Sequence, residues 1–273
     1  MALTRVLITV KTYPTLSETH TELVCTAGFR EDGTMIRIYP VPFRMLNEYQ
    51  KYKKYQWINI DLKRRNRDFR PESYSPVDID KGFELQEIID SKHYDLRKNI
   101  VLKNVYHDMS ELIRECKQED NYKSLAVVKP KEILDFYWKS DAKEWNSEKL
   151  KKIKAKSVQG SLFEEHMPID FNLVRKVPYR FYYRFTTDDN IERNMMIEDW
   201  EVGVLYWNIM DTYHNEEIAC QKVKDKFYHE FIKRDLYFYV GTALSNQLRA
   251  PNPFMIIGVF TPPKVDAVQM NLF

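Results

Sequence analysis

The feature that most constrains the fold is the seven-residue run YRFYYRF at residues 179–185. A period of two places successive side chains on opposite faces of a β-strand. One face is entirely aromatic and needs a covering layer: Tyr179, Phe181, Tyr183 and Phe185. The other face combines ring surface with positive charge: Arg180, Tyr182 and Arg184. The run therefore predicts a strand inside a layered domain.

The segments after this run predict a compact α+β domain over residues 178–263. We expect a strand at 195–197, helices at 201–213 and 216–233, and strands at 236–240 and 254–260. Val223, Phe227 and Phe231 recur every fourth residue, which is the spacing of one helix face. The last two strands are apolar runs bounded by Gly241, Pro251 and Pro253.

The N-terminal third predicts a small β-barrel of the OB type at about residues 1–80. Val6, Ile8 and Val10 alternate, and Asp32-Gly33 indicates a hairpin between strands at 23–27 and 35–39. A helix is expected in 43–55 and a strand in 57–62. Beyond the barrel, Asp108 and Glu111 resemble a capping box ahead of a helix.

These patterns together predict a mixed α+β fold with four parts. Residues 1–156 would form the OB-like barrel with a helical extension, 157–177 a linker, 178–263 the α+β domain and 264–273 a tail. The net charge of +2 excludes a polycationic binder, so any nucleic-acid contact must be a local patch. Three dispersed cysteines and no long apolar run predict a cytoplasmic protein without disulfides or membrane spans.

Two segments are candidates for nucleic-acid binding. The first places five cations in eight residues after a predicted strand: Lys63, Arg64, Arg65, Arg67 and Arg70. The second is the basic-aromatic face with Arg180, Tyr182 and Arg184, which offers the stacking surface and charge that single-strand binders use. The alternatives are a solvated loop for the first segment and an ordinary exposed sheet face for the second.

The densest carboxylate group is Glu198, Asp199 and Glu201, at a predicted strand-to-helix junction. These residues are the candidate catalytic set of a metal-dependent nuclease, and Mg²⁺ would be required only in that case. Acidic side chains also cap helices and oppose the helix dipole, which explains the group without catalysis. No glycine loop for phosphate and no metal-ligand spacing is present in the sequence, so no other cofactor or metal is expected.

The last five residues, QMNLF, resemble the peptide by which bacterial replication and repair proteins dock on the sliding clamp. Gln269 can donate and accept hydrogen bonds at a pocket rim, while Leu272 and Phe273 can fill an apolar cleft. A similar pentapeptide, QGSLF, occurs at 159–163. The alternatives are a frayed terminus for the tail and internal packing for the second copy.

The N-terminal segments Val24–Gly28 and Met35–Pro40 resemble the opening of bacterial dual OB-containing domains. Met35 replaces an aromatic residue of that pattern, and Ile38-Tyr39 separates Arg37 from Pro40. The resemblance implies an association with nucleic-acid transactions and with mobile-element or phage-defence loci. Segments 197–201, 240–242 and 254–260 resemble an uncharacterised bacterial family from which no activity carries over.

The sequence therefore predicts a cytoplasmic DNA-binding protein, with the sliding clamp as its protein partner and DNA repair or antiviral defence as its setting. Two alternatives stay open. One is the metal-dependent nuclease, and the other is an interaction subunit that binds only protein.

Overall fold

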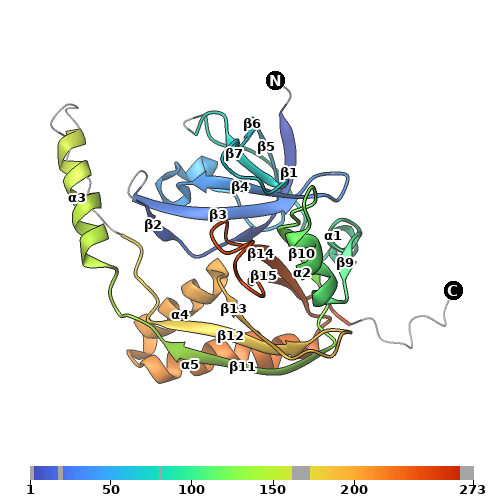
Figure 1. The fold of residues 1–273 in the computed structure, drawn as a ribbon. Coiled ribbons are helices and arrows are strands. Elements are labelled where there is room, and N and C mark those ends of the chain that lie inside the picture. Colours follow the sequence, from blue (N-terminus) through green and yellow to red (C-terminus); the bar gives the residue numbers. More distant parts are fainter. Residues whose placement is uncertain (1–2, 18–20, 80, 162–172, 265–273) are drawn as a thin grey trace.

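Two β-sheets and a layer of helices build the molecule in a computed structural model, which describes residues 3–17, 21–79, 81–161 and 173–264. The first sheet lies above the second in Figure 1, and the helices at residues 200–213 and 216–224 lie along the second sheet at the bottom of the view. The mixed α+β class is confirmed. Among the described residues, no helix has the length and apolar character needed to cross a membrane.

The first sheet is curled and has the order β6-β7-β4-β3-β1-β5-β8, with β2 paired to β3. Its strands are β1 (Thr4–Lys11), β2 (Thr15–Ser17), β3 (Thr21–Phe29), β4 (Met35–Val41), β5 (Gln56–Ile60), β6 (Leu62–Arg64), β7 (Ser73–Pro76) and β8 (Glu84–Ile88). The β3–β4 hairpin is confirmed. Its turn is held by Asp32 Oδ1, which accepts hydrogen bonds from Thr34, and by Gly33 at a φ of +86°.

Both faces of β1 are buried, which explains why its sequence is almost continuously apolar. Val6 and Ile8 pack in the core of the curled sheet, while Leu7 packs in a second core shared with the other sheet. Val10 joins the shared core as well, because the pairing register with β3 shifts between Ile8 and Val10. The first sheet is thus fixed to the second by hydrophobic packing.

The second sheet has the order β11-β12-β13-β15-β14-β10-β9. Its strands are β9 (Val105–Tyr106), β10 (Leu125–Val128), β11 (Glu132–Ser140), β12 (Tyr179–Thr186), β13 (Arg193–Ile197), β14 (Tyr237–Thr242) and β15 (Phe254–Phe260). One face packs against helices, with Phe181, Tyr183 and Phe185 at its centre. The covering layer required by the aromatic alternation is therefore present.

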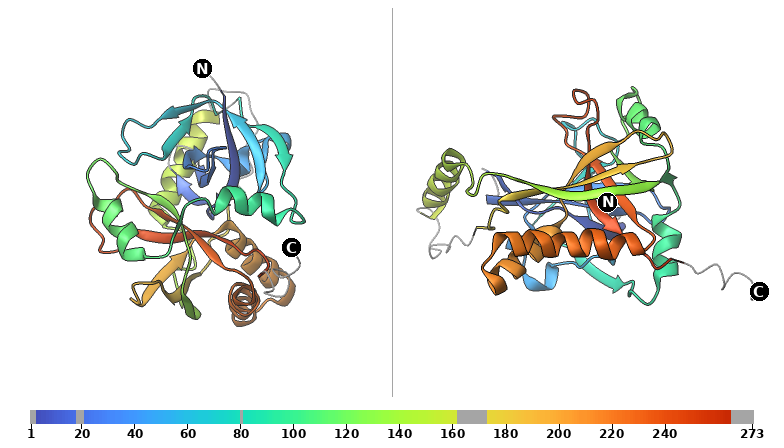
Figure 2. Two further views of the ribbon diagram at one scale, coloured as in Figure 1. Left: turned by 90° about the vertical axis from the view of Figure 1, so that its right-hand side faces the viewer. Right: turned by 90° about the horizontal axis from the view of Figure 1, so that it is seen from below.

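The helices are α1 (Tyr94–Val101), α2 (Met109–Lys117), α3 (Ser147–Ser161), α4 (Trp200–Tyr213) and α5 (Glu216–Lys224). A π-helical turn (Asp225–Glu230) and a 3₁₀ turn (Phe231–Lys233) continue α5. Residues of α2, α4, α5 and these turns pack on the aromatic face of the second sheet, and Figure 2 shows α4 and α5 on the side away from the first sheet. The expected cap of α2 is confirmed, since Asp108 accepts from the backbone N–H groups of Ser110 and Glu111.

Three expectations differ from the structure. Segment 43–55 forms only two 3₁₀ turns, Phe43–Met45 and Glu48–Gln50, because Phe43 and Tyr52 pack into the core of the first sheet rather than along one helix face. Residues 105–140, assigned to the N-terminal part from sequence, contribute β9, β10 and β11 to the second sheet. This placement depends on the pairing of β10 with β14, more than a hundred residues later in the chain. A local sequence pattern does not predict such pairing. Part of the expected linker, 157–161, belongs to α3.

Candidate nucleic-acid interface and adjoining pockets

A stacked pair of tyrosines lies on the face of β11 and β12 opposite the helices. Tyr137 and Tyr182 are direct cross-strand partners, and their rings stack with centroids 5.3 Å apart and planes inclined by 11°. Lys139 Nζ lies 5.7 Å and 5.5 Å from the two ring centroids. Arg180 and Arg184 share the face, because they lie two residues to either side of Tyr182. We call these five residues the tyrosine platform.

The arginines of the platform are held in place by carboxylates at its margins. Arg180 Nε donates to Asp141 at 3.1 Å, and Arg184 Nη1 lies 3.5 Å from Glu192. Lys176 also donates to Asp141 and, together with Arg180, lowers the pKa of that carboxyl to about 2. Both guanidinium groups keep substantial exposure, at 54% and 42% of the side chain. The platform therefore presents positive charge while its geometry is restrained.

Most of the cationic segment 63–70 serves the protein's own structure. Arg70 is buried and makes two hydrogen bonds to Asp68, at 2.8 and 2.7 Å, and one to the backbone oxygen of Thr242 at 2.6 Å. These bonds overcome the effect of burial and lower the pKa of Asp68 to about 2. Arg70 therefore joins the two sheets, and the exposed patch lacks one of its expected members.

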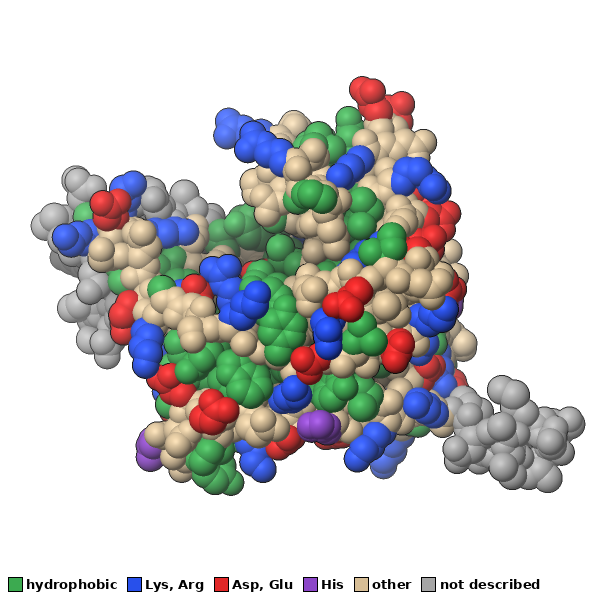
Figure 3. All heavy atoms as spheres, turned by 60° about the horizontal axis from the view of Figure 1, so that its bottom comes forward, with side chains coloured by type: hydrophobic (Ala, Val, Ile, Leu, Met, Phe, Trp, Pro, Cys, Tyr) green, Lys and Arg blue, Asp and Glu red, His purple; other side chains and the backbone are tan. Residues whose placement is uncertain are grey.

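The other cations of the segment divide between internal and exposed roles. Arg64 donates to the backbone oxygens of Arg70, Pro71 and Ser73. Arg65 packs over the Tyr39 ring at 5.0 Å, while Lys63 and Arg67 are exposed. On the face shown in Figure 3, basic and acidic side chains are interleaved. Lys63 and Arg67 are thus the members of this segment best placed for an outside contact.

The three candidate carboxylates are divided between two pockets. Glu198 lines a pocket of about 310 Å³ with Arg180, and burial raises the pKa of its carboxyl while Arg180 opposes that effect. Glu201 lines a pocket of about 390 Å³ and lies 3.0 Å from Lys54. Asp199 lines both, and its Oδ1 accepts from the Glu201 backbone N–H at 2.9 Å as the cap of α4. Asp199 Oδ1 therefore caps α4, which is the role that the second sequence interpretation gives to these acidic residues.

A metal centre does not fit this arrangement. Among the residues that the structure describes, no three His, Cys, Asp or Glu side chains are grouped closely enough to hold an ion. Another carboxylate of this part of the chain, Asp235, pairs with Lys129. Glu198, Asp199 and Glu201 therefore do not supply the converging set of oxygen ligands that a catalytic Mg²⁺ requires.

The pocket of about 390 Å³ contains charged groups that the sequence did not single out. Lys11, Lys53 and Lys54 line it together with Asp199 and Glu201. Asp199 and Glu201 overcome the effect of burial and raise the pKa of Lys54. Lys11 differs, because burial lowers the pKa of its amine to about 8. The pocket thus contains one lysine whose pKa is raised, Lys54, and one whose pKa is lowered, Lys11.

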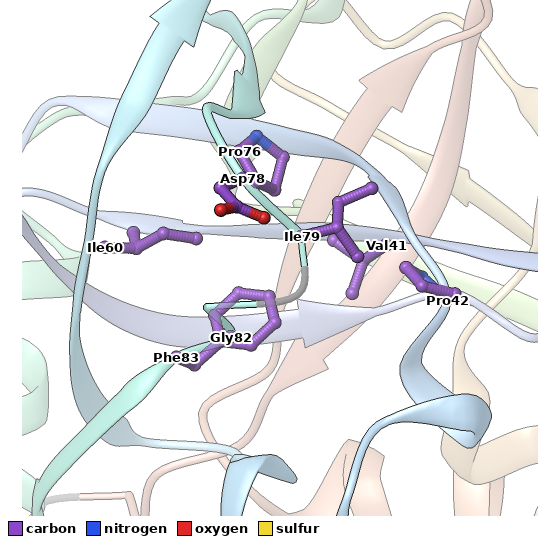
Figure 4. Close-up of a pocket in the computed structure, with 8 residues that line it drawn as sticks. All are labelled: Val41, Pro42, Ile60, Pro76, Asp78, Ile79, Gly82 and Phe83. Carbon is purple, nitrogen blue, oxygen red and sulfur yellow. The ribbon is translucent and has the colours of Figure 1, made fainter.

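A third, smaller space lies inside the first sheet. Figure 4 shows the Asp78 side chain among Ile60, Phe83, Pro76 and Val41, which surround this space. It leaves no room for even a water molecule. We therefore assign it to the core of the first sheet rather than to a binding site.

The expected docking residues Gln269, Leu272 and Phe273 lie outside the described residues. Of the second pentapeptide, residues 159–161 fall within α3 and 162–163 lie outside the described residues as well. Docking of either segment on a sliding clamp stays a prediction.

Two family models match the chain, and they meet where the two sheets divide. One model, described as a domain of unknown function (DUF8757), covers residues 105–273, from β9 onward. The chain belongs to the DUF8757 family. A second model, also described as a domain of unknown function (DUF8758), covers residues 2–103 and hence the first sheet and α1. No curated protein matches the chain. The DUF8757 part contains all five platform residues, and the pockets include residues from both parts.

Sequence reasoning missed residues of both sites. Tyr137 and Lys139 alternate in 132–140, so a search for a strand that complements 179–185 could have found them. Lys11 and Lys54 carry no comparable signal, because each acquires its surroundings from segments distant in sequence.

Proposed function

We propose that the protein binds single-stranded nucleic acid, DNA in particular, across the tyrosine platform. The observation that carries the proposal is the stacked Tyr137–Tyr182 pair with Lys139 beside both rings. Bases stack on exposed aromatic rings without regard to sequence, and neighbouring cations contact the phosphates. Arg180 and Arg184 extend the charge to both sides of the rings along β12.

The low net charge is compatible with such binding if the contact is small. A charge of +2 and interleaved surface charges favour a few phosphate contacts rather than a long electrostatic track. We therefore expect modest affinity in isolation, with a shallow dependence on salt. A second contact that recruits the protein to DNA would raise the effective concentration of the platform near the single-stranded nucleic acid.

The tail supplies that second contact in our proposal. Gln269, Leu272 and Phe273 would dock on a bacterial sliding clamp and bring the platform to replicating or repaired DNA in the cytoplasm. The curled first sheet would act as an OB-like module in this setting, in the context of repair or phage defence. Capture by purified clamp should require residues 269–273, and equal capture of the full chain and a chain without them would rule out docking by the tail.

The direct test of the platform is the binding of a fluorescent single-stranded oligonucleotide, followed by anisotropy. Tyr182→Ala should weaken binding by about 1–3 kcal/mol, which is the contribution of stacking one base. Tyr49→Ala is the matched control, because Tyr49 is 73% exposed and lies in the first part of the chain. Equal loss in both variants, or no loss in Tyr182→Ala, would contradict the proposal.

The same assay separates the alternatives. Cleavage of the oligonucleotide that depends on added Mg²⁺ and is lost in Asp199→Asn would favour the nuclease. Absence of binding at low salt, together with retained clamp capture, would favour an interaction subunit that contacts only protein.

A further inference from the structure

We propose that Lys11 is a nucleophilic amine that forms an imine with an aldehyde bound in the pocket between β1 and the start of α4. This inference does not rest on nucleic-acid binding, because the platform residues do not line that pocket. The pocket holds about 390 Å³, which is enough for a small molecule or one sugar. Its lining residues include an amine, a second cation that can favour the neutral form of that amine, and a carboxyl group that can transfer protons.

Lys11 is positioned by aromatic rings rather than by an ion pair. Its Nζ lies 4.2 Å from the Phe43 ring centroid, 5.1 Å from Trp200 and 5.8 Å from Tyr52. The rings support one another, since Phe43 meets Trp200 edge to face at 5.4 Å. A carboxylate in contact would hold the amine protonated, and the described residues place none within ion-pair distance of Lys11. The amine is therefore held over these rings, on a residue that lines the pocket, and has no ion-pair partner among the described residues.

The surroundings of Lys11 favour its neutral, nucleophilic form. Burial is the largest effect, and the neighbouring cation Lys54 acts in the same direction, so the pKa falls to about 8. Glu201 and Asp199 from α4 oppose this effect, and the exposed Lys53 lines the same pocket. Near neutral pH, an amine of this pKa has a far larger neutral fraction than an ordinary lysine.

Asp199 provides a group for proton transfer. The residue is 3% exposed, and its Oδ2 has no hydrogen-bond donor within the described part of the chain. Lys54 Nζ lies 3.6 Å from this oxygen, beyond hydrogen-bond length. Burial raises the pKa of the carboxyl to about 6. Asp199 lines the pocket, and leaving its buried Oδ2 without a donor costs free energy that a donor on a ligand or intermediate would recover.

The proposed step conserves atoms and electrons. The lone pair of Lys11 Nζ attacks the aldehyde carbon, a C–N bond forms, and the carbonyl π electrons move to oxygen. One proton moves from nitrogen to that oxygen, and the Asp199 carboxyl group supplies the second proton that the oxygen needs to leave as water. The C–O bond then breaks, water leaves, and a protonated imine between Lys11 and the former carbonyl carbon remains.

The experiment traps this imine on the full chain with propanal and cyanoborohydride, which reduces the imine to a stable secondary amine. Peptide mass spectrometry then compares the labelling rate of Lys11 with that of the exposed Lys233. We expect Lys11 to react at least about tenfold faster near neutral pH, with a rate that rises through an apparent pKa of about 8. Labelling no faster than that of Lys233 overturns the proposal.

Two variants separate the chemistry from structure. Lys11→Arg keeps a cation over the rings but has no amine that forms an imine, so fast labelling should be lost while the urea midpoint is retained. Asp199→Asn keeps the cap of α4 and removes the acid. Because Asp199 raises the pKa of Lys11, a purely electrostatic role would make this variant react faster. Proton transfer predicts a rate reduced by about tenfold or more, and a faster variant overturns that role.

The source of the aldehyde is settled by a second arm with a single-stranded oligonucleotide that carries one abasic sugar. Trapping of this sugar at Lys11 identifies a nucleic-acid aldehyde, and trapping of propanal alone identifies a free small molecule. Either result supports the imine. Trapping of neither probe at Lys11 overturns the proposal, whether or not the platform binds the oligonucleotide.

Discussion

The molecule pairs lysine with aromatic rings in two places that differ in their exposure. On the tyrosine platform, Lys139 lies beside Tyr137 and Tyr182 at the surface. In the pocket between β1 and α4, Lys11 lies over the Phe43 ring and is only partly exposed. An exposed cation keeps its charge and suits phosphate binding, whereas burial penalises the charge and favours the free amine. Burial thus changes the protonation chemistry of two lysines that both lie against aromatic rings.

We expect the greatest loss of stability when the ring beneath the buried lysine, Lys11, is removed. Phe43 is 6% exposed and contacts both Tyr52 and Trp200. Phe43→Ala should lower the free energy of unfolding by about 3–5 kcal/mol, because it leaves a cavity in the first core. Tyr137→Ala, at the half-exposed platform, should cost less than about 1.5 kcal/mol. Urea unfolding measures both values. Equal losses of stability in Phe43→Ala and Tyr137→Ala would contradict the expected difference between the buried and the exposed site.

A pH titration of stability sharpens the same comparison. The pKa of Lys11 is lowered in the folded state, so between about pH 8 and 10.5 the unfolded chain binds the extra proton and stability rises with pH. Relative to Lys11→Met, the native protein should therefore gain about 1–3 kcal/mol across this window. If the difference in the free energy of unfolding between the two proteins does not change with pH, burial does not penalise the charge of Lys11.

The smallest expected effect concerns salt. Lys139→Gln should reduce the slope of log affinity against log salt for a single strand by about 0.7, the value of one phosphate contact. Lys11→Gln should leave that slope unchanged, because Lys11 lines a pocket rather than the platform. Anisotropy titrations at several salt concentrations provide the readout. A change in slope for Lys11→Gln would place the strand at the pocket instead.

Local pattern predicted the strands and helices whose signals lie within a few residues. The alternation of 179–185, the turn at Gly33 and the cap at Asp108 all depend on neighbours in sequence and are confirmed. The assignment of 43–55 as a helix was wrong, because contacts of Phe43 and Tyr52 with the first core outweigh helical spacing. The sequence placed Arg70 in a basic run. Only the structure shows that Arg70 is buried and bonded to Asp68 and to the backbone oxygen of Thr242.

The sequence by itself determined which residues alternate, where turns and caps interrupt the chain, and that the arginine–tyrosine face of β12 is distinct from its aromatic face. These properties follow from the geometry of a strand and a helix turn. Only the tertiary structure decided that β11 brings Tyr137 and Lys139 beside Tyr182, and that β1 and α4 enclose Lys11 with Lys54 and Asp199. Burial and charge proximity depend on strand pairing across distant segments, and those quantities set the chemistry of each site.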